Sequence, residues 1–301
     1  MSTQNYEYLH NQLFYWYKAS ARELPWRKTQ DPYQILVSEV MLQQTQVSRV
    51  IDKYNAFIHQ FPNVYSLATA PSSEVIRAWS GMGYNKRAVN LHRAANIIVT
   101  DHNGEVPKSM EALLSLPGVG RYTASAISNF AFGLQVPVVD INIKRVLGRV
   151  DQGALFDTDK LAWETATKYL PSKEKTPEWN QSLMDLGAMV CTARNPGCES
   201  CPLVLNCSAS IKFISMKGGK QTETKLSNKQ NPKFIGSNRY YRGLIISALR
   251  DRTKPIQIDA LGKLIKPTYS STGDTIWITD LISGLIKDGL INVKNGMASL
   301  P

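Results

Sequence analysis

The chain has 301 residues, 43% of them hydrophobic, with 35 Lys and Arg against 24 Asp and Glu, a formal net charge of +11. This length and apolar content predict a multi-domain protein, and the sequence has no run of about 18 apolar residues that would span a bilayer. The first ten residues, MSTQNYEYLH, lack the apolar segment of a signal peptide. We therefore expect a cytoplasmic protein in a reducing compartment.

The first two thirds of the chain, to about residue 210, are predicted to be helical, because apolar residues recur every three or four positions between short Gly and Pro breaks. Near their start, the segment QDPYQILVSEVMLQQTQV predicts a helix capped by Asp31, with Glu39 about two turns inside. Ile35, Leu36 and Leu42 share the face of Glu39, which places this carboxyl among apolar neighbours. Desolvation there favours the protonated form that a general acid needs, whereas a glutamate at a helix edge paired with an arginine is the alternative.

A helix-hairpin-helix signature follows in the segment SLPGVGRYTASAISNFAFG. A tight turn at Leu116, Gly118, Val119 and Gly120 separates two predicted helices. Backbone N–H groups in such a turn, together with the positive end of the second helix, suit a phosphate and bind the DNA backbone without reading its sequence. A plain corner between two helices, built with the same glycines, is the alternative.

A second carboxylate, Asp140, ends the apolar run QVPVVD and precedes another predicted helix. Taken alone, Asp140 is a helix N-cap. Taken with Glu39, it suggests two acids that divide the work of proton donor and stabilising anion around a glycosidic bond.

The cysteines of the chain form one run, C-x6-C-x2-C-x5-C, at Cys191, Cys198, Cys201 and Cys207. Thiolates are soft ligands, and this spacing favours an iron–sulfur cluster. Structural zinc remains an alternative, although its usual signature has two C-x2-C knuckles and this run has one. Disulfides fit poorly with a reducing compartment.

The C-terminal third is the most basic part of the chain. From Ser208 to Pro301 there are 15 Lys and Arg against 6 Asp and Glu, which favours a docking surface for phosphates over a solvated tail. Residues 211–234 are predicted to be a flexible basic linker. Two amphipathic helices and a hairpin at Asn295-Gly296 then predict a winged-helix-like module over residues 235–301, a fold that binds either DNA or proteins.

Seven sequence blocks resemble, in order, those of the helix-hairpin-helix DNA glycosylases of the endonuclease III superfamily, and among them the MutY-type adenine DNA glycosylases. The blocks are LPWR, SEVMLQQTQV, GMGY, LPGVGRYTA, VDINIKRV, MDLGAMVCT and the cysteine run. The resemblance covers roughly residues 4 to 208. It implies an all-α, two-lobed glycosylase core over residues 1–210, with a helical barrel domain (28–137) and a cluster domain built from residues 1–27 and 138–210.

The resemblance also implies roles for individual residues. Glu39 corresponds to the general acid that protonates the departing adenine, and Asp140 to the carboxylate that stabilises the oxocarbenium-like sugar, with Tyr122 and Asn142 as supporting partners. Bifunctional relatives carry a lysine where Tyr122 stands, and a phenol cannot form their Schiff base, so a monofunctional enzyme is implied. The four cysteines would hold a 4Fe-4S cluster.

Further residues are implied to contact DNA. The pocket for the flipped adenine would be lined by Arg22, Trp26, Arg27, Leu42, Val47 and Asp185. The wedge that fills the vacated stack would be Gln44 and Tyr84, and the hairpin residues named above would contact the backbone. The implied partner is double-stranded DNA with a mismatch or an oxidised guanine, bound by a monomer that is nucleoid-associated if the source is bacterial or archaeal.

Two departures from the family pattern leave other functions open. Asn85 stands where a second tyrosine is usual, as in mismatch thymine glycosylases, and the Nudix-like domain that typical members carry at their C-terminal end is missing. One alternative is a related glycosylase for thymine or uracil opposite guanine, or for hypoxanthine. An alternative of another class is a non-catalytic DNA-binding iron–sulfur protein.

Overall fold

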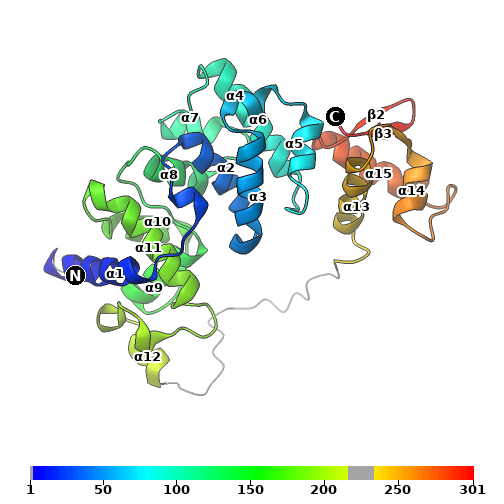
Figure 1. Ribbon diagram of the computed structural model, residues 1–301. Coiled ribbons are helices and arrows are strands. Elements are labelled where there is room, and N and C mark those ends of the chain that lie inside the picture. The colour runs from blue at the N-terminus through cyan, green and yellow to red at the C-terminus, as the bar shows by residue number, and fades with distance from the viewer. Residues whose placement is uncertain (1–2, 216–233) are drawn as a thin grey trace. The chain divides into compact units, whose positions relative to one another are not determined.

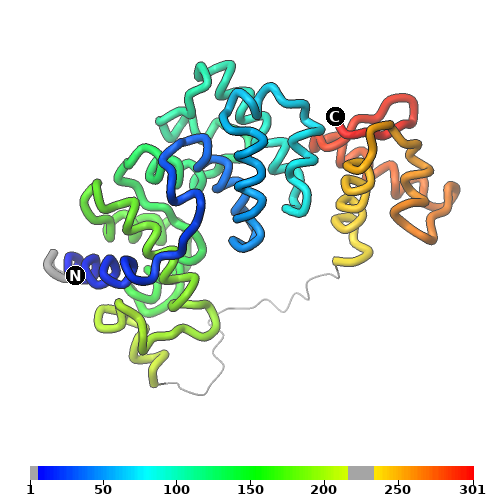
Figure 2. The backbone as a smooth tube through the Cα atoms, in the orientation of Figure 1, coloured from blue at the N-terminus to red at the C-terminus, as the bar shows by residue number. Residues whose placement is uncertain are grey.

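The computed structural model describes residues 3–215 and 234–301 (Figure 1). Contacts within the chain divide it into two compact units. Unit 1 comprises Met1–Ile35, Lys108–Leu114 and Gly120–Asn228, and unit 2 comprises Leu36–Pro107, Ser115–Val119 and Lys229–Pro301. Each unit combines segments that are far apart in the sequence, as the colours of the tube in Figure 2 show. None of the helices in the described ranges is long and apolar enough to cross a membrane.

Unit 1 is helical, as predicted. Its α-helices are α1 (Thr3–Ser20), α7 (Met110–Ser115, whose last residue belongs to unit 2), α8 (Arg121–Phe130), α9 (Ile141–Gln152), α10 (Asp159–Lys168), α11 (Thr176–Met189) and α12 (Ser210–Ser215). Its short 3-10 turns are η1 (Pro25–Arg27), η2 (Lys173–Lys175), η3 (Cys198–Ser200) and η4 (Val204–Asn206). The core lies where α1, α9, α10 and α11 pack together around buried side chains such as Leu13, Ile143 and Trp179.

The units follow different boundaries from the predicted domains. Residues 120–137, predicted to belong to the barrel domain, lie in unit 1. Within unit 1, the buried amide of Asn180 on α11 contacts this segment: its Nδ2 donates to Oδ1 of Asn129 on α8 at 3.0 Å, and its Oδ1 accepts from the backbone N–H of Val138. Residues 211–215 of the predicted linker belong to α12, and residues 216–233 lie outside the described residues.

The helical part of unit 2 begins with the second half of α2 (Pro32–Leu42), followed by α3 (Val47–Gln60), α4 (Val64–Thr69), α5 (Ser72–Ala78) and α6 (Lys86–Asp101). Helices α4 and α5 pack against α6. A capping box starts α4: Asn63 accepts from the Ser66 backbone N–H, and the Ser66 hydroxyl accepts in return. The indole of Trp79 is fully buried after α5 and stacks edge-on against Phe57 of α3.

The C-terminal module has the predicted helices and hairpin. It consists of α13 (Asn238–Arg250), β1 (Ile256–Gln257), α14 (Ile258–Ile265), α15 (Thr275–Lys287), β2 (Asn292–Lys294) and β3 (Met297–Ser299). The strands form an antiparallel sheet in the order β1-β3-β2, and Val293 pairs with Ala298 across the hairpin. Asn295 and Gly296 both have positive φ angles, 52° and 72°, as a tight hairpin turn requires.

This module shares a hydrophobic core with the helices of unit 2. Ile245, Ile246 and Leu249 on the apolar face of α13 are buried together with Ile76 of α5 and Val89 of α6. Amphipathic periodicity predicted that α13 had an apolar face, but it could not predict which surface would cover that face. Residues 234–301 are therefore packed onto α5 and α6 and are not a separate body.

Candidate active site

The predicted site residues fall in both units. Unit 1 holds Arg22, Trp26, Arg27, Gly120, Tyr122, Asp140, Asn142, Asp185 and the four cysteines. Unit 2 holds Glu39, Leu42, Gln44, Val47, Tyr84, Leu116, Gly118 and Val119.

Glu39 lies inside α2, which begins as predicted. The Asp31 carboxylate accepts a hydrogen bond from the Tyr33 backbone N–H at 2.8 Å and caps the helix. Glu39 is only 4% exposed, and Leu36 and Val40 beside it are 1% and 2% exposed. A carboxyl in such surroundings is desolvated, which is the environment that the sequence predicted for it.

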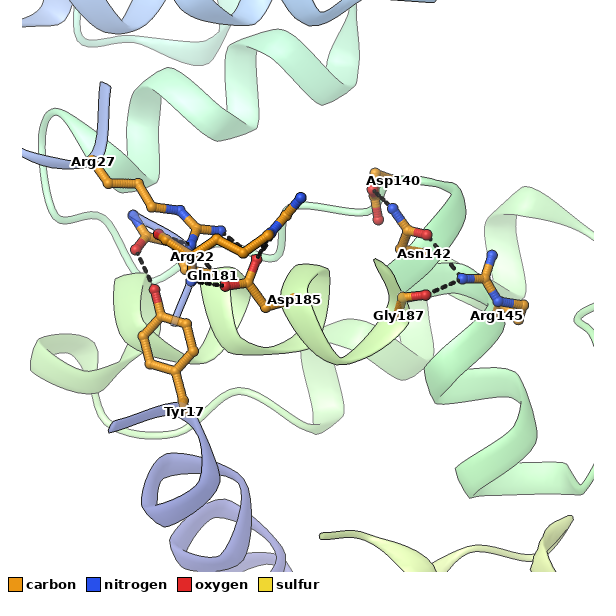
Figure 3. Close-up of polar contacts among 9 residues, drawn as sticks. All are labelled: Tyr17, Arg22, Arg27, Asp140, Asn142, Arg145, Gln181, Asp185 and Gly187. Atoms are coloured by element: carbon orange, nitrogen blue, oxygen red, sulfur yellow. Dashed lines mark hydrogen bonds and ion pairs between the residues drawn. The ribbon is translucent and has the colours of Figure 1, made fainter. Parts of the chain in front are cut away.

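Asp140 is the N-cap of α9 and is half-buried (Figure 3). One carboxylate oxygen accepts from the backbone N–H of Ile143 at 2.7 Å, and the other accepts from Nδ2 of Asn142 at 2.8 Å. Burial raises the pKa of the Asp140 carboxyl above its ordinary value, although these hydrogen bonds and the charge of Arg145 oppose the rise. The carboxylate is thus fixed in position with both oxygens oriented.

Two residues around Asp140 were not predicted as functional. Nη2 of Arg145 donates to Oδ1 of Asn142 at 2.8 Å and to the carbonyl of Gly187 at 2.6 Å (Figure 3). Its Nε donates to the carbonyl of Cys191 at 2.8 Å. A Cβ on Gly187 would lie 2.6 Å from Cβ of Asn142, so only glycine lets α11 come this close to α9. Arg145 lies in the block VDINIKRV and Gly187 in the block MDLGAMVCT. The sequence of these blocks did not indicate that the two residues would be in contact.

Asp185 forms an ion-pair cluster with the two predicted pocket arginines, Arg22 and Arg27 (Figure 3). It is fully buried, and its oxygens accept from Nε of Arg22 at 2.7 Å and from both terminal nitrogens of Arg27 at 2.7 and 2.8 Å. Burial works to raise the pKa of Asp185, but the hydrogen bonds and charge of the arginines outweigh it and hold the pKa below its usual range. Asp185 therefore fixes two guanidinium groups, and Trp26 beside them in η1 is 8% exposed.

The predicted hairpin separates α7 from α8. Gly118 has a φ of +83°, and a Cβ there would lie 3.0 Å from Cβ of Asn90, so this position needs glycine for its own conformation. Gly120 is the N-cap of α8 with an ordinary φ of −99°, and a Cβ would meet no atom of the described residues within 4 Å. The turn is closed by a hydrogen bond from the Val119 backbone N–H to the Leu116 carbonyl. Tyr122 is the second residue of α8 and is half-buried.

Both predicted wedge residues have backbone conformations that non-glycine residues rarely adopt. Gln44 has a φ of 53° and Tyr84 a φ of 45°, and both side chains are exposed. Gln44 lies in the turn between α2 and α3, flanked by the half-buried Leu42 and Val47. Strain of this kind tends to be kept at functional positions.

The four cysteines form no disulfide with one another and line a single cavity with apolar side chains such as Val146 and Leu186. Burial raises the pKa of three of the thiols, that of Cys201 to about 12, and repulsion from neighbouring cysteines adds to the shift. Within the described ranges, the acidic, histidine and cysteine side chains form no preorganised metal-binding group. Four soft sulfur donors around one apolar cavity nevertheless fit a cationic iron–sulfur group, whose charge would relieve their repulsion.

Known proteins match this chain in both sequence and structure. A profile described as "HhH-GPD superfamily base excision DNA repair protein" matches residues 37–172. The "Adenine DNA glycosylase" of Mycobacterium tuberculosis (strain CDC 1551 / Oshkosh) is 36% identical over 306 residues, which cover 96% of this chain and 92% of that protein. The chain belongs to the adenine DNA glycosylase family.

Solved structures of this superfamily confirm the predicted glycosylase fold. A thermostable thymine-DNA glycosylase superposes with a TM-score of 0.65 at 33% identity, covering 69% of this chain and 98% of that structure. The structure of a trapped endonuclease III–DNA covalent intermediate superposes with a TM-score of 0.62 at 25% identity, covering 71% of this chain and 99% of that structure. Because the mycobacterial adenine DNA glycosylase matches 96% of the chain, its similarity extends into the C-terminal module.

The hydrogen bond from Asn142 gives a pH test in this family member. In Asn142→Ala, the Asp140 anion loses a donor, so its pKa rises further and a smaller fraction is ionised at each acidic pH. The acid limb of single-turnover base release should therefore move to higher pH, measured from about pH 4 to pH 8. An acid limb that stays in place would show that another group controls it.

The contact at Gly187 gives a stability test. Gly187→Ala should lower the free energy of unfolding by about 1 to 3 kcal/mol, because the new methyl group overlaps Asn142. The matched control is Gly243→Ala in α13, where a Cβ meets no described atom within 4 Å and alanine should stabilise the helix by up to about 1 kcal/mol. Urea denaturation followed by circular dichroism compares the two, and equal effects would refute the close approach.

Proposed function

We propose that the chain is a monofunctional DNA glycosylase that hydrolyses the N-glycosidic bond of adenine mispaired with 8-oxoguanine or guanine. The observation that carries this proposal is the Asp140 carboxylate, fixed by Asn142 and the Ile143 amide, in a chain 36% identical to an adenine DNA glycosylase. DNA glycosylase activity itself follows from family membership. The base and its opposite partner are the proposed part.

In the proposed mechanism, the buried Glu39 is the proton donor. It protonates N7 of adenine, which makes a neutral purine a better leaving group. The C1′–N9 bond then breaks, and its electron pair leaves with the base. A water molecule then adds at C1′ and loses a proton to the solvent. Glu39 regains its proton from the solvent.

Asp140 has the complementary role. Positive charge develops at C1′ as the bond breaks, and a fixed carboxylate in a water-poor site stabilises it more than bulk water does. Its orientation needs no reorganisation during the reaction, because Asn142 and the Ile143 amide hold both oxygens. The absence of an amine nucleophile at Tyr122 supports hydrolysis without strand cleavage.

A base within a duplex is out of reach of both acids, so the target nucleotide must be extruded first. The two arginines that Asp185 holds by ion pairs, Arg22 and Arg27, are proposed to line the pocket that receives the adenine. The other proposed lining residues are Trp26, Leu42 and Val47. Gln44 and Tyr84, already held in strained conformations at the surface, are proposed to fill the vacated stack. The hairpin from Leu116 to Gly120 would hold the backbone through N–H groups.

We further propose that Cys191, Cys198, Cys201 and Cys207 hold a 4Fe-4S cluster. When bound, such a cluster orders the cysteine loop through its thiolate bonds. Purified protein should therefore absorb near about 400 nm with about four iron atoms per chain, and Cys201→Ser should lose that absorbance. A colourless protein with one zinc ion per chain would favour structural zinc.

The mispair specificity is tested with duplexes that differ only at the central pair. A duplex with adenine opposite 8-oxoguanine or guanine should be cleaved after alkali treatment, whereas a duplex with adenine opposite thymine should stay intact. Thymine opposite guanine is the informative competitor, because Asn85 and the likeness to a thymine-DNA glycosylase both favour it. Breakage at thymine without breakage at adenine would reject the proposal.

A further inference from the structure

Unit 2 contains an open groove of about 570 Å3 between the predicted wedge residues and α13 of the C-terminal module. We propose that this groove binds the sugar-phosphate backbone of the DNA strand that the wedge enters, and that α13 supplies one of its walls. The proposal rests on the proposed function for one point only, the assignment of Gln44 and Tyr84 as the wedge.

The groove has the charge of a phosphate site. Its lining contains five cationic side chains, on Arg49, Lys86, Arg87, Arg239 and Arg242, and a single carboxylate. Phosphates dominate the affinity of proteins for DNA, and a concave surface with this excess of positive charge concentrates them.

Three of the five cations also hold the groove together. Asp288 of the module lies between Lys86 of α6, at 2.8 Å, and Arg242 of α13, at 2.5 Å. Arg87 is buried, and one of its terminal nitrogens donates to the carbonyls of Val40 and Met41, both at 2.8 Å. These contacts fix the floor of the groove and join the module to α6.

The other two cations, Arg49 and Arg239, are exposed residues of the groove lining. Arg239 on α13 is exposed, with its guanidinium 4.9 Å from the ring centre of Phe234 and 3.5 Å from the Tyr84 hydroxyl. Arg49 on α3 is exposed in the same lining, and its side chain has no ion pair with a residue of the described ranges. Each guanidinium is thus available to give charge-assisted hydrogen bonds to a phosphodiester in the groove.

Hydrogen bonds join the module to α5 and to the residue that follows Tyr84. Arg250 of α13 donates to the Ile76 carbonyl at 3.1 Å and to Oδ1 of Asn85 at 2.7 Å. In return, Arg77 of α5 donates to the Arg250 carbonyl at 3.1 Å. Asn85, the residue that departs from the family pattern, is therefore a docking contact for the C-terminal module.

The wedge residues and the groove form one continuous surface. Gln44 and Tyr84 both line it, and both have the strained positive φ described above. The rings of Tyr84 and Phe234 add flat apolar surface on which a sugar or base can lie. A DNA strand that leaves the wedge through this groove therefore meets the lining that includes Arg49 and Arg239.

The test measures the salt dependence of binding, using full-length protein and a fluorescent duplex with a stable abasic-site analogue opposite guanine. Arg49→Gln and Arg239→Gln should each weaken binding several-fold and reduce the slope of log Kd against log salt by about 0.9, the value for one lost phosphate contact. Arg239→Lys keeps the charge and should keep the slope. The matched control is Lys263→Gln on α14, in the same module but outside the groove lining, which should bind like the parent.

Two outcomes would overturn the proposal. If both glutamine variants keep the parental slope of log Kd against log salt, the groove does not bind the DNA backbone. If only Arg49→Gln changes this slope, the C-terminal module does not contribute to the phosphate site. Adenine release by the same parent preparation tests the proposed function separately. Salt slopes that change as expected, without adenine release, would support the groove and reject only the base specificity.

Discussion

Replacing Asp140 with asparagine should reduce the single-turnover rate of adenine release by about 100-fold to 1,000-fold or more, because one preorganised charge is lost from the transition state. The fold should survive. Asparagine caps helices as well as aspartate does, so its side-chain oxygen can still accept from the Ile143 amide, and the free energy of unfolding should change by less than about 1 kcal/mol.

This variant separates the two roles that the sequence left open for Asp140, N-cap and catalytic anion. A matched control is Asp159→Asn in the same unit, an exposed carboxylate on α10 paired with Lys144, which should leave base release unchanged. Single-turnover release and urea denaturation are measured on all three proteins. If Asp140→Asn releases adenine at the parental rate, Asp140 is only a helix cap.

Replacing Glu39 with glutamine should also have a large effect, a loss of about 100-fold to 10,000-fold in adenine release, because the general acid disappears. The amide has nearly the same shape as the carboxyl, so packing around the buried side chain of α2 is kept.

The control for this variant is Glu74→Gln, an exposed glutamate in the first turn of α5 in the same unit. A substrate with a better leaving group than adenine offers a further check, because it depends less on protonation and should be released by Glu39→Gln with a smaller defect. An equal defect on both substrates would argue against proton donation by Glu39.

Local sequence patterns predicted the secondary structure around Glu39 and Asp140 correctly. Asp31 and Asp140 precede helices as caps, the spacing of Leu36 and Glu39 placed both on one buried face, and Asn295-Gly296 marked a tight turn. These features depend on neighbours within about one or two helical turns. Family resemblance then supplied the roles, which the local pattern could not.

Contacts between distant segments could not be predicted in the same way. The two motifs did not indicate that Gly187 would contact Asn142, or that Arg145 would bind the carbonyls of both Gly187 and Cys191. These contacts depend on how α9 packs against α11, and the two helices are about 40 residues apart in the sequence. The packing of α13 on α5 and α6, with Asn85 as a contact of Arg250, also depends on shape complementarity that periodicity does not encode.

We predict that Glu39 and Asp140 act on the same N-glycosidic bond. The most direct measurement is a crystal structure of the Asp140→Asn variant bound to a duplex with adenine opposite 8-oxoguanine. We predict one extruded adenosine with the Glu39 carboxyl within about 3 Å of N7 and residue 140 beside C1′ on the same nucleotide. A complex in which the two side chains contact different nucleotides, or in which no adenosine leaves the helix, would contradict it.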